Sequence, residues 1–281
     1  MVIERAPLED ELGDVLDKAM RGCGLEESEV ARRAEIPVER LRSVIDYCEK
    51  LTPPEIDRVA EVLHLQAVGL HAVASEAYPL PDICGLPCCL YPLRMRHGIG
   101  VANAYLVADC SNDGGILFDT GTGAEGLWRS WPSKISRVAA VFLTHYETEH
   151  TGGLAAIRER FRDVTVFGPD DESRPAGVMA LADGAVVNES GFSIEVCSTP
   201  GHVEAHHCYR VSQTCAPQGR PLLISGDLLF AGSIGGAYHC CKRLHASLER
   251  MVNGSIPETV VAPGHGPLTT LENERKFNPF L

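Results

Sequence analysis

The sequence predicts an α/β protein in which two packed β-sheets carry helices on their outer faces, preceded by a small all-α domain. Within residues 93–281, short apolar runs typical of buried strands alternate with helical segments at 155–161 and 245–252. Such strands bury their apolar faces when two sheets pack together with helices outside, which leaves the loops at one edge. The first 70 residues instead carry apolar side chains at helical spacing.

The N-terminal region, residues 1–71, is expected to form four helices. The first has apolar positions at helical spacing: Leu12, Val15, Leu16 and Ala19. A second helix opens within 24–31, and a turn at Pro37 leads into a third. A capping sequence, Thr52-Pro-Pro-Glu55, precedes the fourth, whose apolar face holds Ile56, Val59, Ala60, Leu63 and Leu65. The following stretch, 72–92, is rich in proline and is interpreted as the linker to the domain at 93–281.

The most informative segment is 144–153, Thr-His-Tyr-Glu-Thr-Glu-His-Thr-Gly-Gly. It places four potential metal ligands within six positions, namely His145, Glu147, Glu149 and His150. The preceding residues, 138–143, are apolar and predict a buried strand. The ligands therefore follow the C-terminal end of a core strand, where a rigid scaffold presents side chains to a cleft.

Three later segments repeat this arrangement of a short apolar run, a glycine-containing turn and one ligand-type residue. The three residues are His202, Asp227 and His265, after the runs 192–196, 222–224 and 259–261. Each unit alone is a weak signal, because such turns are common. Four strand-then-ligand units in one chain predict a metal site.

The order of these ligands resembles that of the metallo-β-lactamase superfamily of metallohydrolases. The usual loop of that family is Thr-His-x-His-x-Asp-His, followed by a His, a bridging Asp and a last His. Residues 103–107 (Asn-Ala-Tyr-Leu-Val) and 116–121 (Ile-Leu-Phe-Asp-Thr-Gly) are similar to its first hairpin and its Asp-x-Gly strand end. The run from Gly264 onward is similar to the glyoxalase II-like (hydroxyacylglutathione hydrolase-like) branch. The resemblance covers about residues 93–281 and implies a four-layer αββα sandwich.

The resemblance also implies a site for two divalent metal ions. Its candidate ligands are His145, Glu147, Glu149, His150, His202, Asp227 and His265. Asp227 would bridge the two ions and, with Glu149, act as a catalytic residue. Asp119 would orient a ligand without binding metal itself, and Tyr209 would contact the substrate. His206 is expected to be structural or to support a ligand.

Two positions depart from the family pattern, because Glu147 replaces the second His and Glu149 replaces the Asp. Carboxylate ligands move a site away from zinc, so iron or manganese is favoured and zinc remains possible. Glu149 is one methylene longer than Asp. It is therefore interpreted as a ligand, as a group supporting a ligand, or as a base.

The reaction expected first is hydrolysis of a small ester or thioester, with a metal-bound hydroxide attacking the carbonyl. Glu147 supports an alternative, a diiron oxidoreductase or oxygenase on the same fold, because diiron members of the superfamily share the His-x-Glu feature. A third hypothesis is a regulator in which a metal-sensing domain controls the N-terminal module.

The N-terminal region is similar to Cro/repressor-type helix-turn-helix domains, which implies that the helix starting near Pro37 would enter the DNA major groove. Its charge argues against that function. Residues 1–80 contain 17 Asp and Glu against nine Lys and Arg, a balance of −8, whereas phosphate contacts need a basic face. We therefore expect the module to cover the cleft or to form a homodimer, and not to bind DNA.

The whole chain of 281 residues has a net charge of −13, which argues against nucleic acid or an anionic membrane as partner and favours a small-molecule substrate. It has no apolar run of 18 residues, and its first residues are too polar for a signal peptide, so a cytoplasmic location is expected. In that compartment its 11 cysteines are expected as free thiols or metal ligands and not as a disulfide framework. Cys84, Cys88 and Cys89 are grouped just before the domain at 93–281. Cys240 and Cys241 follow His239 in the loop after Asp227, which the family resemblance places at the cleft.

Overall fold

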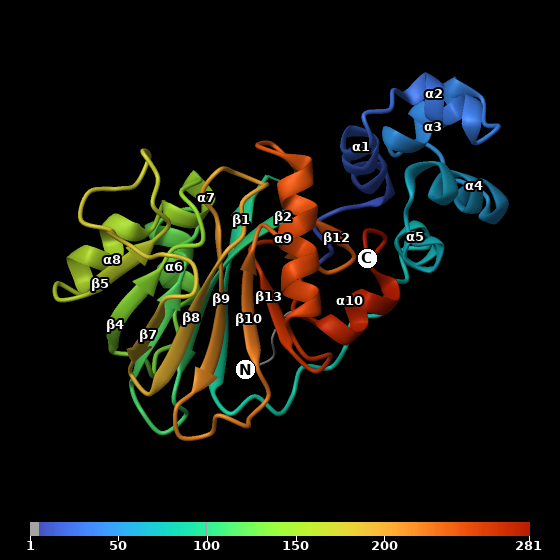
Figure 1. Ribbon diagram of the computed structural model, residues 1–281. Helices are drawn as coiled ribbons and strands as arrows, with labels where there is room; N and C mark the ends of the chain where they lie inside the picture. The colour runs from blue at the N-terminus through green and yellow to red at the C-terminus, as the bar shows by residue number, and fades with distance from the viewer. Residues whose placement is uncertain (1–5, 99) are drawn as a thin grey trace.

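The computed structural model describes residues 6–98 and 100–281, and Figure 1 shows a helical part beside a larger part built on β-sheets. The helical part consists of α1 (Leu12–Cys23), α2 (Glu27–Arg33), α3 (Val38–Ile45), α4 (Pro53–Leu63) and α5 (Ala67–Ala74). We call it the N-terminal module. None of the helices among the described residues is long and apolar enough to span a membrane.

The four helices predicted for the module are confirmed, and each follows from local sequence. Helix α4 begins at the predicted capping box, in which the Thr52 and Glu55 side chains satisfy each other's backbone N–H groups. Helix α1 ends where Gly24 adopts a φ of 64°, a conformation that costs glycine little. Leu65, which was assigned to the apolar face of the fourth helix, lies beyond the end of α4. The fifth helix, α5, was not predicted. The module has its own apolar core, which includes Leu16, Leu41 and Leu70.

The larger part contains two six-stranded sheets. The first has the order β1-β2-β3-β4-β5-β6, with bounds Cys89–His97, Gly100–Ala108, Gly114–Phe118, Arg137–Phe142, Thr165–Gly168 and Met179–Ala180. The second has the order β14-β13-β10-β9-β8-β7, with bounds Thr269–Thr270, Val260–Pro263, Leu222–Gly226, His207–Gln213, Phe192–Ser198 and Val186–Glu189. A small hairpin joins β11 (Leu229–Phe230) to β12 (Ser233–Ile234).

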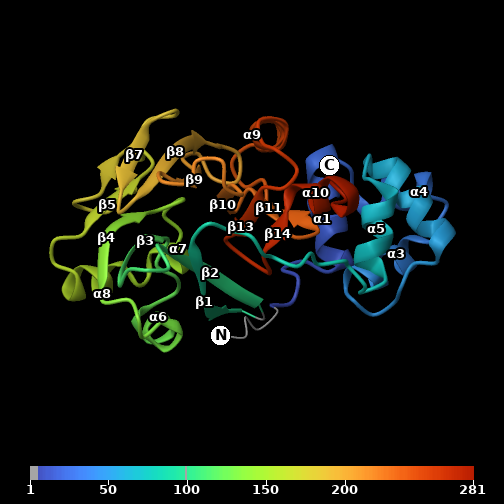
Figure 2. The same ribbon diagram turned by 90° about the horizontal axis from the view of Figure 1, so that it is seen from below.

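The expected four-layer αββα arrangement is confirmed. Helices α6 (Ala124–Ser130) and α8 (Leu154–Arg160) pack on the outer face of the first sheet, and α9 (Cys241–Asn253) and α10 (Leu271–Phe277) cover the second (Figure 2). Successive side chains of a strand point to opposite faces of the sheet, so alternate residues pack into different layers. On β10, Leu222 and Ile224 enter the core between the sheets, whereas Leu223 packs against α9.

The N-terminal module is docked on the second sheet through α10 and the β11–β12 hairpin. The backbone N–H of Gln66 donates to the carbonyl oxygen of Pro279 at 2.7 Å, and Lys18 Nζ donates to that of Ile234 at 2.7 Å. Gly69 lies so close to α10 that an added Cβ would stand 2.5 Å from the carbonyl oxygen of Phe277. The module is therefore packed against the larger part and is not a freely tethered domain.

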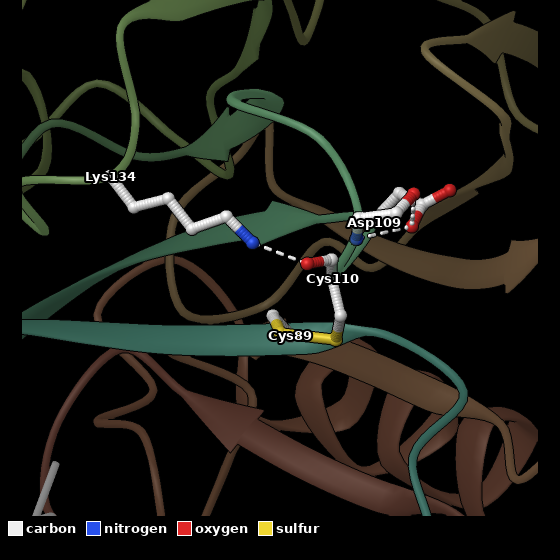
Figure 3. Close-up of a disulfide and its surroundings, with 5 residues drawn as sticks. Cys89, Asp109, Cys110 and Lys134 are labelled. Carbon is white, nitrogen blue, oxygen red and sulfur yellow. Dashed lines mark hydrogen bonds between the residues drawn. A yellow bond between two sulfur atoms is a disulfide. The ribbon is translucent and has the colours of Figure 1, made fainter.

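The segment between the two parts is shorter than expected, because α5 ends at Ala74 and β1 begins at Cys89. Residues 75–88 connect them, in place of 72–92. Cys89 forms a disulfide with Cys110, across the ends of β1 and β2, and Lys134 Nζ donates to the carbonyl oxygen of Cys110 (Figure 3). The expectation of free thiols is therefore wrong for this pair, while the other nine cysteines are free.

The basic residues of α3 are engaged within the module. Arg40 forms ion pairs with Glu49 and Glu55, and Arg42 with Glu27 and Glu39. An arginine held by two carboxylates is a poor phosphate ligand, because binding would have to break both pairs. We expect no salt-sensitive, sequence-selective complex when the full chain is titrated with double-stranded DNA libraries at physiological salt. A complex with a dissociation constant near 10⁻⁸ M, typical of specific binders, would overturn this expectation.

Candidate metal centre

The predicted ligands of the first ion position come from three loops at one edge of the sheets. His145 follows β4, and Glu147 is the N-cap of the short helix α7 (Thr148–Thr151). His202 follows β8 and Asp227 follows β10. One ligand atom from each of these four residues lies within 4.8 Å of the others. Glu147 Oε2 stands 3.4 Å from Nε2 of both His145 and His202, so the carboxylate that replaces the usual imidazole sits inside the group.

A second group lies next to the first and shares Asp227. It consists of His150 on α7, Asp227 and His265, which follows β13. Asp227 Oδ1 is 3.4 Å from His150 Nε2, and Oδ2 is 3.2 Å from His265 Nε2. The same Oδ2 is 3.7 Å from His202 Nε2 in the first group. Asp227 thus faces both groups, as a bridging ligand must.

The buried polar atoms of these groups fit metal ions. His145, His150 and His202 each have a buried Nε2 atom without a hydrogen-bond partner, and Asp227 Oδ1 is in the same state. A buried polar atom without a partner is costly, so a cluster of them indicates a ligand that satisfies them together. Imidazole nitrogens with carboxylate oxygens form a donor set suited to iron, manganese and zinc.

The opposite sides of the imidazole rings are held by hydrogen bonds that aim each Nε2 at the site. Nδ1 of His202 donates to the Gly236 carbonyl oxygen at 2.8 Å. Nδ1 of His265 donates to the Val101 carbonyl oxygen at 3.1 Å. A carbonyl oxygen only accepts, so in both rings Nδ1 carries the proton and Nε2 is free to bind metal.

Asp119 supports His150 in the way the sequence predicted. Its Oδ2 is 3.1 Å from His150 Nδ1, and its two oxygens also accept from the backbone N–H and the hydroxyl of Thr144, at 2.8 and 2.9 Å. Asp119 has a positive φ of 55°, a conformation that Asp tolerates better than most residues. The turn after β3 therefore fixes both the start of the ligand loop and one ligand ring.

His206 supports the bridging aspartate. Its Nε2 accepts the backbone N–H of Asp227 at 3.1 Å, and its Nδ1 lies 2.7 Å from the Thr199 hydroxyl. Burial lowers the pKa of His206 well below its usual value, so the ring is neutral and able to accept. This agrees with the structural or supporting role expected for His206.

The charges within the site stabilise its carboxylates in the ionised form. Burial opposes ionisation of Asp227, but the neighbouring His265 and His150 hold its pKa well below the usual range. The imidazoles of His145 and His202, each 3.4 Å from the carboxylate, lower the pKa of Glu147. Both carboxylates are thus anionic ligands at neutral pH, as metal coordination requires.

Two predicted residues lie elsewhere. Glu149 belongs to neither ligand group among the described residues, because on α7 its carboxylate points toward His97, 3.7 Å from Nε2. It lines the adjoining cleft, so a role in metal binding is not supported. The prediction of a substrate contact for Tyr209 is wrong. This side chain is fully buried between the sheets against Phe118 and Phe142, and its hydroxyl donates to Leu143.

The two cysteines expected near the cleft face another direction. Cys240 precedes α9 and Cys241 is its first residue. Cys241 Sγ donates to the carbonyl oxygen of Gly22 at 3.6 Å, on the N-terminal module. From the same loop it is Tyr238 that lines the cleft.

The cleft beside the ligands also contains residues that the sequence did not reveal. The N-terminal segment and α1 contribute Glu9, Asp14 and Lys18, and the larger part contributes His97, Phe230 and Tyr238. Residues of the N-terminal module thus line part of the cleft. Phe230 and Tyr238 stand in the loop after Asp227, which the family resemblance places at the cleft.

Comparisons with known proteins agree with this geometry. The family described as the metallo-beta-lactamase superfamily matches residues 97–265. A hydroxyacylglutathione hydrolase of Pseudomonas entomophila (strain L48) is 34% identical over 157 residues, 55% of this chain and 57% of that protein. The structure of TTHA1623 in a di-iron-bound form is 30% identical, with a TM-score of 0.52, over 67% of this chain and 99% of that one. ETHE1 from Myxococcus xanthus shares the fold at 24% identity and a TM-score of 0.55, over 67% of this chain and 83% of that one.

Proposed function

Because the chain belongs to the metallo-beta-lactamase superfamily, we propose that it is a dinuclear-metal hydrolase of a small ester or thioester. The observation that carries the proposal is the position of Asp227 between two groups of imidazole nitrogens, three of them buried without a partner. Similarity to a hydroxyacylglutathione hydrolase supports a thioester. The chain spans 57% of the length of that relative, so the substrate is part of the proposal.

The residues divide into holding and orienting roles. Two bound divalent ions would supply an activated water with a pKa of about 7 and would polarise the carbonyl of the substrate. His145, Glu147 and His202 would hold one ion, and His150 and His265 the other, with Asp227 shared. Asp119 fixes the ring of His150, and His206 fixes the backbone of Asp227. No serine or cysteine nucleophile is required by this arrangement.

The reaction class is tested directly by offering the metal-loaded protein a panel of small esters and thioesters. We expect release of free thiol or alcohol that stops when the metal is removed with a chelator and returns when it is restored. Absence of hydrolysis across the panel by fully loaded protein would refute the proposal.

Glu147 leads to a prediction about the metal itself. We expect iron or manganese to match or exceed zinc in protein purified from cells supplied with all three, because a carboxylate replaces an imidazole. Glu147→His should move the preference toward zinc, while Glu159→His, exposed on α8, should leave it unchanged. The measurement is elemental analysis of each purified protein. Stoichiometric zinc with negligible iron and manganese in the unmodified chain would contradict the prediction.

A second candidate function is a diiron oxidoreductase or oxygenase. The observation that favours it is Glu147 within the first ligand group, together with the 30% identical TTHA1623, whose structure contains two irons. The two functions separate in one experiment on iron-loaded protein. Oxygen consumption in step with product, with an untouched thioester panel, would replace the hydrolase assignment.

A further inference from the structure

The N-terminal module contributes one wall of the cleft beside the metal centre. The cavity has a volume of about 250 Å³. Figures 1 and 2 show that α1 lies beside the β11–β12 hairpin. The wall consists of Glu9, Asp10, Asp14, Asp17, Lys18 and Arg21. It lines the same cavity as Glu147, His202 and Asp227. A substrate that reaches the metal ligands therefore also meets the module.

The two cations of this wall are already paired. Lys18 Nζ forms an ion pair with Asp10 and donates to the carbonyl oxygen of Ile234 at 2.7 Å. Arg21 forms an ion pair with Asp17, one turn earlier on α1. Neither cation is free to bind a carboxylate of the substrate without giving up an existing partner.

Two carboxylates of the wall, those of Glu9 and Asp14, form no ion pair with a lysine or arginine among the described residues. In that part of the chain, Asp14 accepts from the Tyr47 hydroxyl at 2.6 Å and from the Glu11 backbone N–H at 2.9 Å. Glu9 Oε2 has no hydrogen-bond partner, and Oε1 lies 3.6 Å from Nδ1 of His265.

The lining of the same cavity also includes an aromatic ring and a nitrogen atom without a hydrogen-bond partner. Tyr238 is 68% exposed, and its ring centroid is 5.2 Å from that of His202. His202 is only 3% exposed, and its Nε2, without a hydrogen-bond partner, belongs to the same cavity. An aromatic face near uncompensated carboxylates is the arrangement that binds ammonium groups.

We propose that the substrate carries an ammonium group, which Glu9, Asp14 and Tyr238 bind while the ester or thioester carbonyl lies at the metal centre. The inference rests on the proposed hydrolase function and assigns its substrate class. The N-terminal module is then a specificity element of the cleft. An anionic substrate meets repulsion from the same carboxylates, reinforced by the net charge of −13.

The test uses three thioacetates whose leaving thiols carry a positive charge, no charge or a negative charge. They are acetylthiocholine, its uncharged isostere 3,3-dimethylbutyl thioacetate, and S-acetyl-3-mercaptopropionate. We expect kcat/KM for the cation to exceed that for the isostere by about tenfold, and the anion to be slowest, as expected for a partly exposed charge pair. The difference should appear mainly in KM and should shrink as salt is added.

Variants identify the residues responsible. Glu9→Gln and Asp14→Asn should each lower the ratio of kcat/KM for the cation to kcat/KM for the isostere several-fold. Asp46→Asn removes the same charge from an exposed position of the module outside the cavity and should change nothing. Equal kcat/KM for the three thioacetates, or a preference for the anion, would overturn the inference and leave the hydrolase function standing.

A binding measurement separates the inference from the reaction. Calorimetric titration of the metal-loaded full chain with choline and with 3,3-dimethyl-1-butanol requires no turnover. We expect choline to bind about tenfold more tightly, and Glu9→Gln to reduce that ratio. Equal binding of the two probes refutes ammonium recognition, whereas tighter choline binding without any thioester hydrolysis refutes only the proposed reaction.

Discussion

Replacing Asp227 with alanine should abolish turnover and lower the content of both metal ions together. Its two carboxylate oxygens lie 3.2 to 3.7 Å from Nε2 atoms of His150, His202 and His265, so one side chain serves both ligand groups. Replacing a residue that only hydrogen-bonds to a metal ligand lowers metal affinity or activity roughly 10–100-fold. Loss of a ligand shared by both ions should lower them further. The measurement combines elemental analysis with kcat/KM on a thioester substrate.

The control for this variant is Asp163→Ala, which removes an exposed carboxylate that follows α8 and belongs to neither ligand group. It should keep the metal content and rate of the unmodified chain. Circular dichroism of both variants shows whether the fold is retained. A folded Asp227→Ala protein with two ions per chain and an unchanged rate would mean that the metal centre lies elsewhere.

Replacing Gly264 with alanine should lower activity almost as severely, because the added methyl group clashes with metal ligands and not because a charge is lost. A Cβ at this position would stand 2.1 Å from Asp227 Oδ1 and 2.9 Å from His150 Cε1. Both neighbours are ligands of the second group, so the added methyl must displace a ligand. A displacement of about 1 Å in a catalytic site costs on the order of 10²-fold in rate. We expect that loss in kcat/KM, with weaker binding of one ion per chain.

Gly123→Ala provides the matched control, because its added Cβ would meet no heavy atom within 4 Å. Gly123 also stands in a loop at the end of the first sheet, so the comparison isolates the contact with the ligands. An unchanged rate and two bound ions in Gly264→Ala would show that the second group does not hold a metal ion.

The metal ligands could be predicted from the sequence because each lies in a loop that follows a short buried strand. In the parallel pairs β3–β4 and β10–β13, the C-terminal strand ends meet at one edge of a sheet. Packing the two sheets then brings the two edges together. Local spacing and the family motif therefore sufficed to place His145, His202, Asp227 and His265 in one site.

The direction in which a side chain points was harder to predict from the sequence than the loop or strand on which it lies. Tyr209 lies on β9, soon after the loop that carries His202. Successive side chains of a strand point to opposite faces, so Tyr209 and Val211 face the core between the sheets, whereas Cys208 faces the outer helices. Glu149 lies two residues from Glu147, but α7 turns it away toward His97. A one-residue change in a helical turn rotates a side chain by about 100°, which motif matching does not register.

The sequence by itself determined the four-layer fold, the first four helices of the module and the ligands of the metal centre, because these follow from local periodicity, capping and motif order. Only the tertiary structure decided that Cys89 pairs with Cys110 and that Glu9 and Asp14 form part of the cleft. The contact between Lys18 and Ile234 joins residues 216 positions apart. Such contacts depend on how the N-terminal module docks on the larger part. Docking is set by the complementary shapes of two surfaces, each assembled from residues far apart in the chain, so no local sequence pattern predicts it.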